Sequence, residues 1–174
     1  MQMSYNYHMI ILDASTLILL AKITIIEMFI SNFHGRVLIS EKVRVEVSVE
    51  GAEEAPLIGK LIKEKKINVL KVKNIRLAKK LMEDFNIDSG EAETLTLALQ
   101  EKADVIATDD RNAIRACRIL KMDFTTAIAV LIRSCEKKLL DKDEALIKLK
   151  KLESIARYNR EIIEDARKQI KGGT

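Results

Sequence analysis

Short runs of apolar residues alternate along the chain with longer segments in which apolar residues recur every three or four positions. The short runs predict buried strands at residues 9–12, 36–39, 66–72, 104–108 and 122–124. The longer segments predict helices at residues 15–30, 41–49, 57–65, 75–85, 91–102 and 112–120. Because strands and helices alternate in this way, we expect an α/β fold with a central parallel sheet and helices on both faces.

Individual residues support several of these boundaries. Gly35 interrupts the apolar pattern before the second strand, and Ser40 is a suitable N-cap for the helix that follows it. Pro56 suits the first turn of the next helix. From Thr125 onward the chain is predicted to be helical, with a break near Leu140.

The helical segment after Thr125 carries two apolar stripes. One contains Leu146, Leu149 and Leu152, and the other contains Ile155, Ile162, Ile163 and Ala166. We therefore divide the chain into an α/β domain over residues 1–132 and a helical extension over residues 133–174. The extension carries twelve Lys or Arg and eight Asp or Glu. Its stripes favour amphipathic helices packed on the domain or on a partner over direct contact with RNA.

Composition narrows the class of protein. The chain has 174 residues, of which 48% are hydrophobic and 32% charged, as in a soluble globular domain. The net charge of +4 mildly favours an anionic partner, whereas the absence of Trp argues against an aromatic platform for bases. Cys117 and Cys135 are too far apart for a zinc motif and are expected to be reduced. We expect a cytoplasmic protein without a membrane segment, because no apolar stretch reaches the roughly 18 to 20 residues that a span needs.

Acidic residues follow two of the predicted strands. Asp13 comes directly after residues 9–12, and Asp109 and Asp110 come directly after residues 104–108. The carboxyl ends of parallel strands lie at one edge of a sheet, where ligands bind in open α/β folds. Carboxylates gathered there repel each other unless a cation lies between them, so a hard divalent metal is the first hypothesis.

Each carboxylate also has a purely structural interpretation. Asp13 could cap the helix after it, although Ser15 could do so equally well, and only one of the paired aspartates is needed as a cap. Glu91 has capping-box spacing from Asp88. Glu46 could be a surface charge paired with Lys42, four residues earlier in the same helix.

Four segments taken together resemble the successive acidic motifs of the PIN-domain family, in the family's order. They are Leu12-Asp13-Ala14-Ser15, Val43-Arg44-Val45-Glu46-Val47, Gly90-Glu91-Ala92-Glu93 and Ala107-Thr108-Asp109-Asp110. The resemblance covers about residues 9–132, and the Gly-Glu-Ala-Glu form is similar to a prokaryotic subgroup of the family.

The resemblance implies a three-layer α/β/α domain with a metal-dependent ribonuclease site. The implied catalytic and metal-binding carboxylates are Asp13, Glu46, Glu91 and Asp109. It further implies Asp110 as an additional acidic metal ligand, with Ser15 and Glu93 in supporting positions. Mg²⁺ or Mn²⁺ is the implied ion, and RNA is the implied substrate. Some relatives are toxins of toxin–antitoxin pairs, so the resemblance also implies an antitoxin protein and a homodimer as partners.

Arginines after the paired aspartates could bind the substrate. Arg111, Arg115 and Arg118 lie on one face of the predicted helix, where they could contact RNA phosphates or simply face solvent. We take Arg111 and Arg115 as substrate-binding candidates.

Two other functions remain to be weighed. One is a catalytically weak PIN-like domain that binds RNA or serves as a scaffold, which only an assay separates from an enzyme. The other is an aspartyl-phosphate hydrolase, which would need a second aspartate where this chain has Ser15. The chain also lacks Gly-rich nucleotide-binding motifs.

Overall fold

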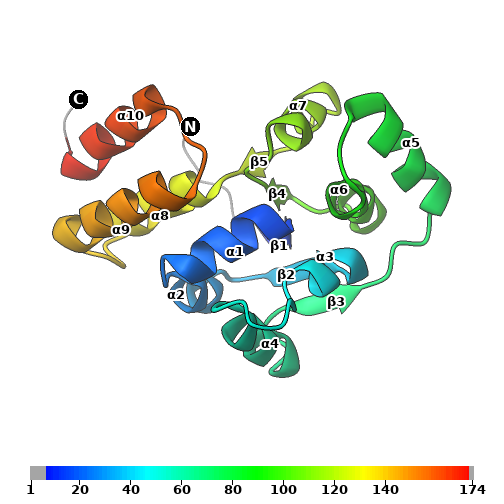
Figure 1. The fold of residues 1–174 in the computed structure, drawn as a ribbon, viewed down its shortest axis with the longest axis horizontal. Helices are drawn as coiled ribbons and strands as arrows, with labels where there is room; N and C mark the ends of the chain where they lie inside the picture. The colour runs from blue at the N-terminus through cyan, green and yellow to red at the C-terminus, as the bar shows by residue number, and fades with distance from the viewer. Residues whose placement is uncertain (1–6, 173–174) are drawn as a thin grey trace.

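A five-stranded parallel sheet forms the centre of the protein in this computed structural model, which describes residues 7–172 (Figure 1). The strands are β1 Met9–Leu12, β2 Arg36–Ser40, β3 Asn68–Leu70, β4 Val105–Ala107 and β5 Phe124–Thr125. Their order across the sheet is β3-β2-β1-β4-β5, so the first strand of the chain is the central one. The predicted parallel sheet is confirmed, and every strand overlaps the segment predicted for it.

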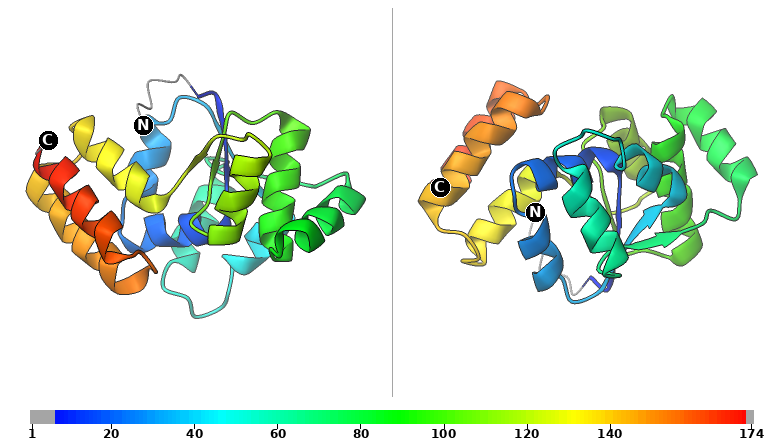
Figure 2. Two further views of the ribbon diagram at one scale, coloured as in Figure 1. Left: turned by 90° about the horizontal axis from the view of Figure 1, so that it is seen from above. Right: turned by 60° about the horizontal axis from the view of Figure 1, so that its bottom comes forward.

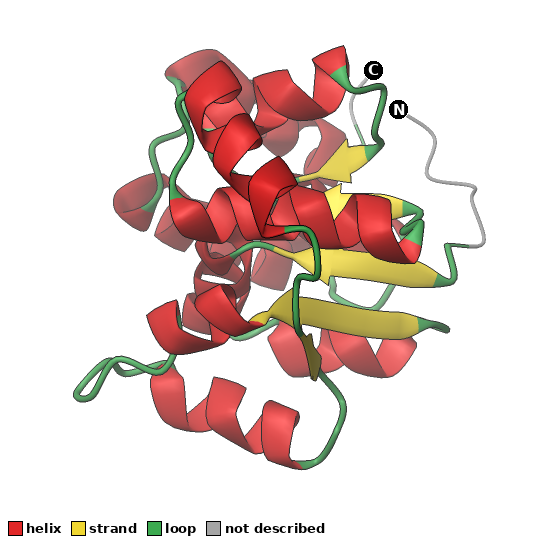
Figure 3. Ribbon diagram, turned by 90° about the vertical axis from the view of Figure 1, so that its right-hand side faces the viewer, coloured by secondary structure: helices red, strands yellow, loops and turns green. Residues whose placement is uncertain are grey.

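Helices cover both faces of the sheet (Figure 3). They are α1 Ala14–Lys22, α2 Ile26–Asn32, α3 Glu41–Glu46, α4 Ala55–Lys63, α5 Ile75–Phe85, α6 Ser89–Glu101, α7 Arg111–Ile119, α8 Ala127–Glu136, α9 Lys142–Ile155 and α10 Arg160–Lys171. Alternate strand residues point to opposite faces. Accordingly Ile10 and Leu12 pack with α1, α8 and α9, whereas Ile11 packs with α5, α6 and α7. This arrangement is the expected three-layer α/β/α architecture.

The helix predicted over residues 15–30 is wrong, because two helices occupy that segment. Thr24 adopts a left-handed conformation with φ of 61°, and α1 and α2 are bent by 110° relative to each other. Ile23 and Ile25 on either side of it are buried, so the turn directs both side chains into the core. Lys148 of α9 donates hydrogen bonds to the Ile23 carbonyl oxygen and to Thr24 Oγ1, at 3.0 and 2.8 Å.

Within residues 7–172 no single helix has the length and apolar character to cross a membrane, although the bent pair α1 and α2 together meets that test. Both cysteines are free thiols. Cys117 is buried, and this burial raises the pKa of its thiol to about 11, which makes it unreactive at neutral pH.

The extension comprises the last turn of α8 together with α9 and α10, and these three helices lie side by side at one end of the molecule (Figures 1 and 2). The predicted break near Leu140 is present, but a second break at residues 156–159 was not predicted. Leu149, Leu152 and Ile163 are buried in the same cluster as the central strand. Two stripe residues are not buried: Ile155 is 39% exposed and Ile162 is 43% exposed.

Candidate active site

Asp13 lies at the end of the central strand and is 2% exposed. Its Oδ1 accepts a hydrogen bond from the Ala14 amide at 2.8 Å, and its Oδ2 accepts from the hydroxyls of Ser15 and Thr108 at 3.0 and 2.9 Å. Asp13 itself, and not Ser15, therefore caps α1. Burial raises the pKa of Asp13 to about 6 despite these three hydrogen bonds, and the charge of Asp88 adds to the increase.

Asp109 and Asp110 follow β4 but take different partners. Asp110 caps α7 by accepting from the Ala113 amide at 2.8 Å. Asp109 instead contacts both α1 and the start of α8, because its Oδ2 accepts from Thr16 Oγ1 of α1 at 2.5 Å and from the Ala127 amide of α8 at 3.0 Å. The hydroxyl of Tyr158, in the connection between α9 and α10, donates to Asp109 Oδ1. As predicted, only one of the two aspartates, Asp110, caps a helix. Asp109 instead accepts hydrogen bonds from residues of α1, of α8 and of the connection between α9 and α10.

Glu91 forms the predicted capping box at the start of α6. The Glu91 amide donates to Asp88 Oδ1 at 2.9 Å, and the Asp88 amide donates back to Glu91 Oε2 at 2.8 Å. Even so, the pKa of Glu91 is raised to about 7. Burial is the largest cause, and the charges of Asp110, Asp88 and Asp13 add to it. The capping role therefore coexists with a place among the other carboxylates.

Glu46, the last residue of α3, lies against the start of α6. A Cβ atom at Gly90 would be 2.1 Å from Glu46 Oε1, so only glycine leaves room for this carboxylate. Burial raises the pKa of Glu46 to about 7, with further contributions from Asp88 and Asp13 that the charge of Lys42 does not cancel. The absence of a side chain at Gly90 thus lets the Glu46 carboxylate lie against the first turn of α6.

We expect Gly90→Ala to displace Glu46 while leaving the fold intact. Position 90 is in the first turn of a helix, where alanine is intrinsically favoured over glycine by about 1 kcal/mol. The melting temperature should therefore stay the same or rise, whereas affinity for Mn²⁺ measured by calorimetry should fall several-fold. Gly59→Ala is the matched control, because no atom lies within 4 Å of its added Cβ. Equal metal affinities of the two variants would show that Glu46 takes no part in the site.

The predicted site residues thus form one electrostatic group with one exception. The charge of Asp88 raises the pKa values of Asp13, Glu46 and Glu91, and the charge of Asp110 adds to the increase at Glu91. Asp109 differs from these residues, because burial is the cause of its raised pKa and its hydrogen bonds oppose that increase. Within residues 7–172 no three Asp, Glu, His or Cys side chains are already arranged to hold a metal ion.

The chemistry of this donor set nevertheless fits a hard divalent cation. All the donors are carboxylate oxygens, which Mg²⁺ and Mn²⁺ prefer. Desolvation and repulsion between carboxylates raise the pKa values of Glu46 and Glu91. A cation bound between the carboxylates would stabilise their charged forms and so lower these pKa values.

The other predicted residues occupy different positions around this group. Ser15 Oγ donates to Asp13 and accepts from the Asp109 amide at 3.1 Å, so it joins the two strand ends. Glu93 accepts from the Lys42 amide at 3.2 Å and thereby links α6 to the first turn of α3. Of the arginines, Arg111 lines the pocket described next, whereas Arg115 is not among its lining residues.

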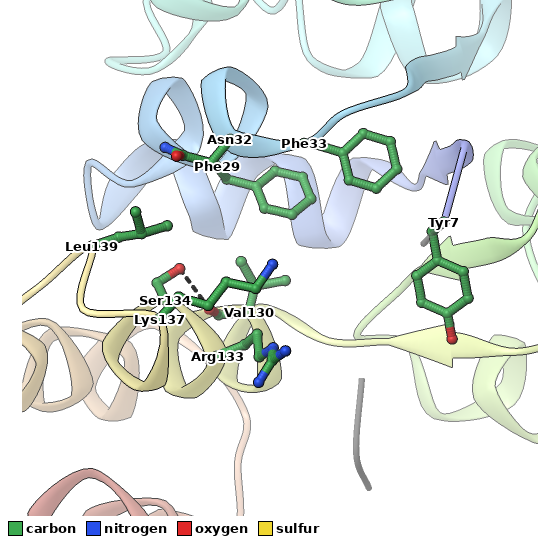
Figure 4. A pocket seen from close by; sticks show the side chains of 9 residues that line it. All are labelled: Tyr7, Phe29, Asn32, Phe33, Val130, Arg133, Ser134, Lys137 and Leu139. Carbon is green, nitrogen blue, oxygen red and sulfur yellow. Dashed lines mark hydrogen bonds between the residues drawn. The ribbon is translucent and has the colours of Figure 1, made fainter. Parts of the chain in front are cut away.

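A pocket of about 730 Å³ opens beside the carboxylates. Glu91, Asp109 and Asp110 line one part of it, and α1, α7 and the connection between α9 and α10 complete its walls. A second, smaller pocket lies between α2 and α8 and is lined by Tyr7, Phe29, Asn32, Phe33, Val130, Arg133, Ser134, Lys137 and Leu139 (Figure 4). No carboxylate lines that pocket, so the first is the candidate active site.

Sequence reasoning missed two contributors to this site. Asp88 was considered only as a cap, but its charge raises the pKa of Asp13, Glu46 and Glu91. No sequence pattern indicates a role for Tyr158, because it is separated from Asp109 by 49 positions and belongs to no motif. The change from apolar to polar residues at 156–159 is the signal in the sequence that could have indicated the break between α9 and α10.

A protein-family model described as a PIN domain matches residues 9–172 of the chain. The match covers the α/β domain and also the three helices of the extension. No curated protein matches the chain.

Proposed function

Because the chain belongs to the PIN-domain family, whose fold is a nuclease fold, we propose that it is a metal-dependent endoribonuclease. The observation that carries this proposal is the group of carboxylates with raised pKa values at the edge of the sheet, opening into a pocket that also holds cationic side chains. Carboxylates and cations in one pocket suit a reaction in which a metal ion acts on a phosphate group.

Asp13, Glu46, Glu91 and Asp110 would hold the ion in this proposal. Mg²⁺ or Mn²⁺ bound there supplies the positive charge that a phosphodiester needs while water attacks it. We assign Asp110 this place because its charge acts on Glu91. Asp109, which the sequence resemblance placed among the ligands, receives hydrogen bonds from three other residues and supports the site instead.

The neighbouring hydroxyls fix the orientation of Asp13. Thr108 and Ser15 both donate to Asp13 Oδ2, which leaves Oδ1 with only the amide of Ala14. Arg111 lines the same pocket and can neutralise a substrate phosphate. The chain needs no serine or cysteine nucleophile for this chemistry, because water is the attacking group.

The proposal is tested with purified protein and a fluorescent single-stranded RNA. We expect internal cleavage of the RNA when Mn²⁺ is present at about 5 mM. A concentration of this order is needed because carboxylate sites bind such ions weakly. Chelation by EDTA should stop the reaction, and readdition of metal should restore it. A DNA strand of the same sequence serves as the comparison substrate. Absence of cleavage across a panel of RNAs at saturating Mn²⁺ would count against an enzyme.

A catalytically weak RNA-binding protein is the second candidate function. The observation that favours it is that no three potential ligands in residues 7–172 are already arranged around an ion. Calorimetric titration of Mn²⁺ distinguishes the two candidates, because an enzyme of this kind must bind the ion, whereas an RNA-binding protein need not.

A further inference from the structure

The connection between α9 and α10 is part of the wall of the candidate active site. Its residues Ala156, Arg157, Tyr158 and Asn159 all line the pocket next to Asp109. The Tyr158 hydroxyl donates to Asp109 Oδ1 and accepts from the Ile128 amide at 3.3 Å, in the first turn of α8. This one side chain therefore attaches the extension to both the sheet edge and α8.

The hydrogen bonds of the Tyr158 hydroxyl can hold the connection between α9 and α10 in one position. Tyr158 is partly buried, and its hydroxyl both donates and accepts a hydrogen bond, which satisfies the group as it leaves water. Asp109 is held from its other side by Thr16 and by the Ala127 amide.

The pocket beside this anchor is lined by four cationic side chains. Lys22 comes from α1, Arg111 and Arg118 from α7, and Arg157 from the connection. Arg118 also lies over the ring of Phe124, 5.4 Å from its centroid, which restricts where its charge can be. Cations from three separate elements therefore surround one cavity, and this distribution suits a chain of phosphates better than a single anion.

Five isoleucines also line the pocket. Ile18, Ile114, Ile128, Ile155 and Ile162 contribute aliphatic surface, and the exposure of Ile155 and Ile162 is explained by their position on this wall. A nucleotide presents a charged phosphate on one side and a largely apolar base face on the other. A pocket with cations and aliphatic side chains can contact both parts.

We propose that the connection between α9 and α10 completes a binding site for single-stranded RNA, in which Tyr158 anchors the connection on Asp109 and Arg157 binds a backbone phosphate. The inference rests on the proposed nuclease function and assigns part of the substrate site to the extension. RNA is the occupant we commit to because the lining combines cations with the carboxylates of the proposed reaction. Tyr158 is a positioning residue in this scheme, because it acts through Asp109 and the connection.

The first test measures binding of a fluorescent single-stranded RNA by anisotropy in EDTA, where cleavage does not occur. We expect Arg157→Gln to weaken binding by about three- to ten-fold and to lower the salt dependence of the binding constant by about 0.7, the value for one phosphate of a single strand. Arg160→Gln is the matched control, because Arg160 begins α10 and does not line the pocket. Equal affinities of Arg157→Gln and the unaltered protein, or equal losses in both variants, would overturn the proposal.

The second test examines the anchor with Tyr158→Phe, which removes only the hydroxyl. We expect weaker RNA binding, faster hydrogen exchange at residues 156–159, and a smaller effect of Arg157→Gln in the Tyr158→Phe background than alone. A purely structural role for Tyr158 would leave the effect of Arg157→Gln unchanged. Fully additive effects of the two substitutions would therefore refute the anchoring role.

The proposed nuclease function and the proposed RNA site can be refuted separately. RNA binding that depends on Arg157 without any metal-dependent cleavage would refute the nuclease function and keep the RNA site. Cleavage of RNA that is unaffected by Arg157→Gln would keep the nuclease function and refute the RNA site. If the protein has no detectable affinity for RNA and a bound protein instead protects the pocket, the proposal that RNA occupies this pocket is refuted.

Discussion

Asp13→Asn is expected to reduce Mn²⁺-dependent RNA cleavage by roughly two to three orders of magnitude, the loss that follows when one electrostatic contributor to a transition state is removed. Asp13 is the most buried of the carboxylates, and three donors fix its two oxygens. Asparagine has nearly the same shape but removes the negative charge that would attract the ion. The measurement is the initial rate of cleavage at saturating RNA, together with calorimetric Mn²⁺ affinity.

The same substitution should leave the fold intact. Asparagine caps helices as well as aspartate does, so α1 keeps its N-cap. The single oxygen of the asparagine amide takes the place of Oδ1 at this cap, and its NH2 group, in the place of Oδ2, can donate to the hydroxyls of Thr108 and Ser15, which accept as well as donate. Asp104→Asn is the matched control, since Asp104 accepts from the His8 and Met9 amides near the opposite end of β1. Full activity of Asp13→Asn, or an equal loss in Asp104→Asn, would contradict the assignment.

The metal-free protein is expected to become less stable as the pH rises from about 5 to about 8. The folded-state pKa of Asp13 is raised to about 6, and those of Glu46 and Glu91 to about 7. Groups with raised pKa values bind protons more tightly when folded. Their stabilising contribution is therefore complete below the unfolded values near 4 and is lost as the pH passes through 6 and 7. For Asp13 alone the shift corresponds to about 3 kcal/mol.

Divalent metal should reverse this loss. A ligand that binds only the folded state raises the free energy of unfolding, and Mn²⁺ binds the ionised carboxylates that predominate at high pH. Urea unfolding at pH 5, 6, 7 and 8, with EDTA and with Mn²⁺, measures both effects. Glu46 and Glu91 are less buried than Asp13, so each should contribute less than Asp13 does. Asp13→Asn serves as the comparison, because its metal-free stability should vary less with pH. A metal-free stability that increased over this range would contradict the raised pKa values.

Much of the fold could be predicted from the sequence because apolar periodicity reports burial directly. The predicted helix over residues 75–85 has the observed bounds, and Ser40 and Pro56 occupy the predicted positions at the starts of α3 and α4. The break at Thr24 could not be predicted in this way. Its flanking residues are apolar on both sides, and a left-handed threonine has no sequence signature.

The candidate site was predicted in part for a similar reason. Asp13 and Glu91 follow from strand-end position and cap spacing, which are local features. The different partners of Asp109 and Asp110, both of which were predicted as metal ligands, could not be predicted locally, because the partners of Asp109 come from distant segments. Thr16, Ala127 and Tyr158 hold Asp109, and only the folded chain brings these three together.

The distance along the chain between Asp109 and Tyr158 has a consequence for synthesis on the ribosome. The central strand pairs with β4, so the sheet edge that carries Asp13 and Asp109 can form once residues 105–107 have emerged. The wall that contains Tyr158 emerges about fifty residues later. A growing chain would therefore display its acidic edge before the wall that we propose binds RNA.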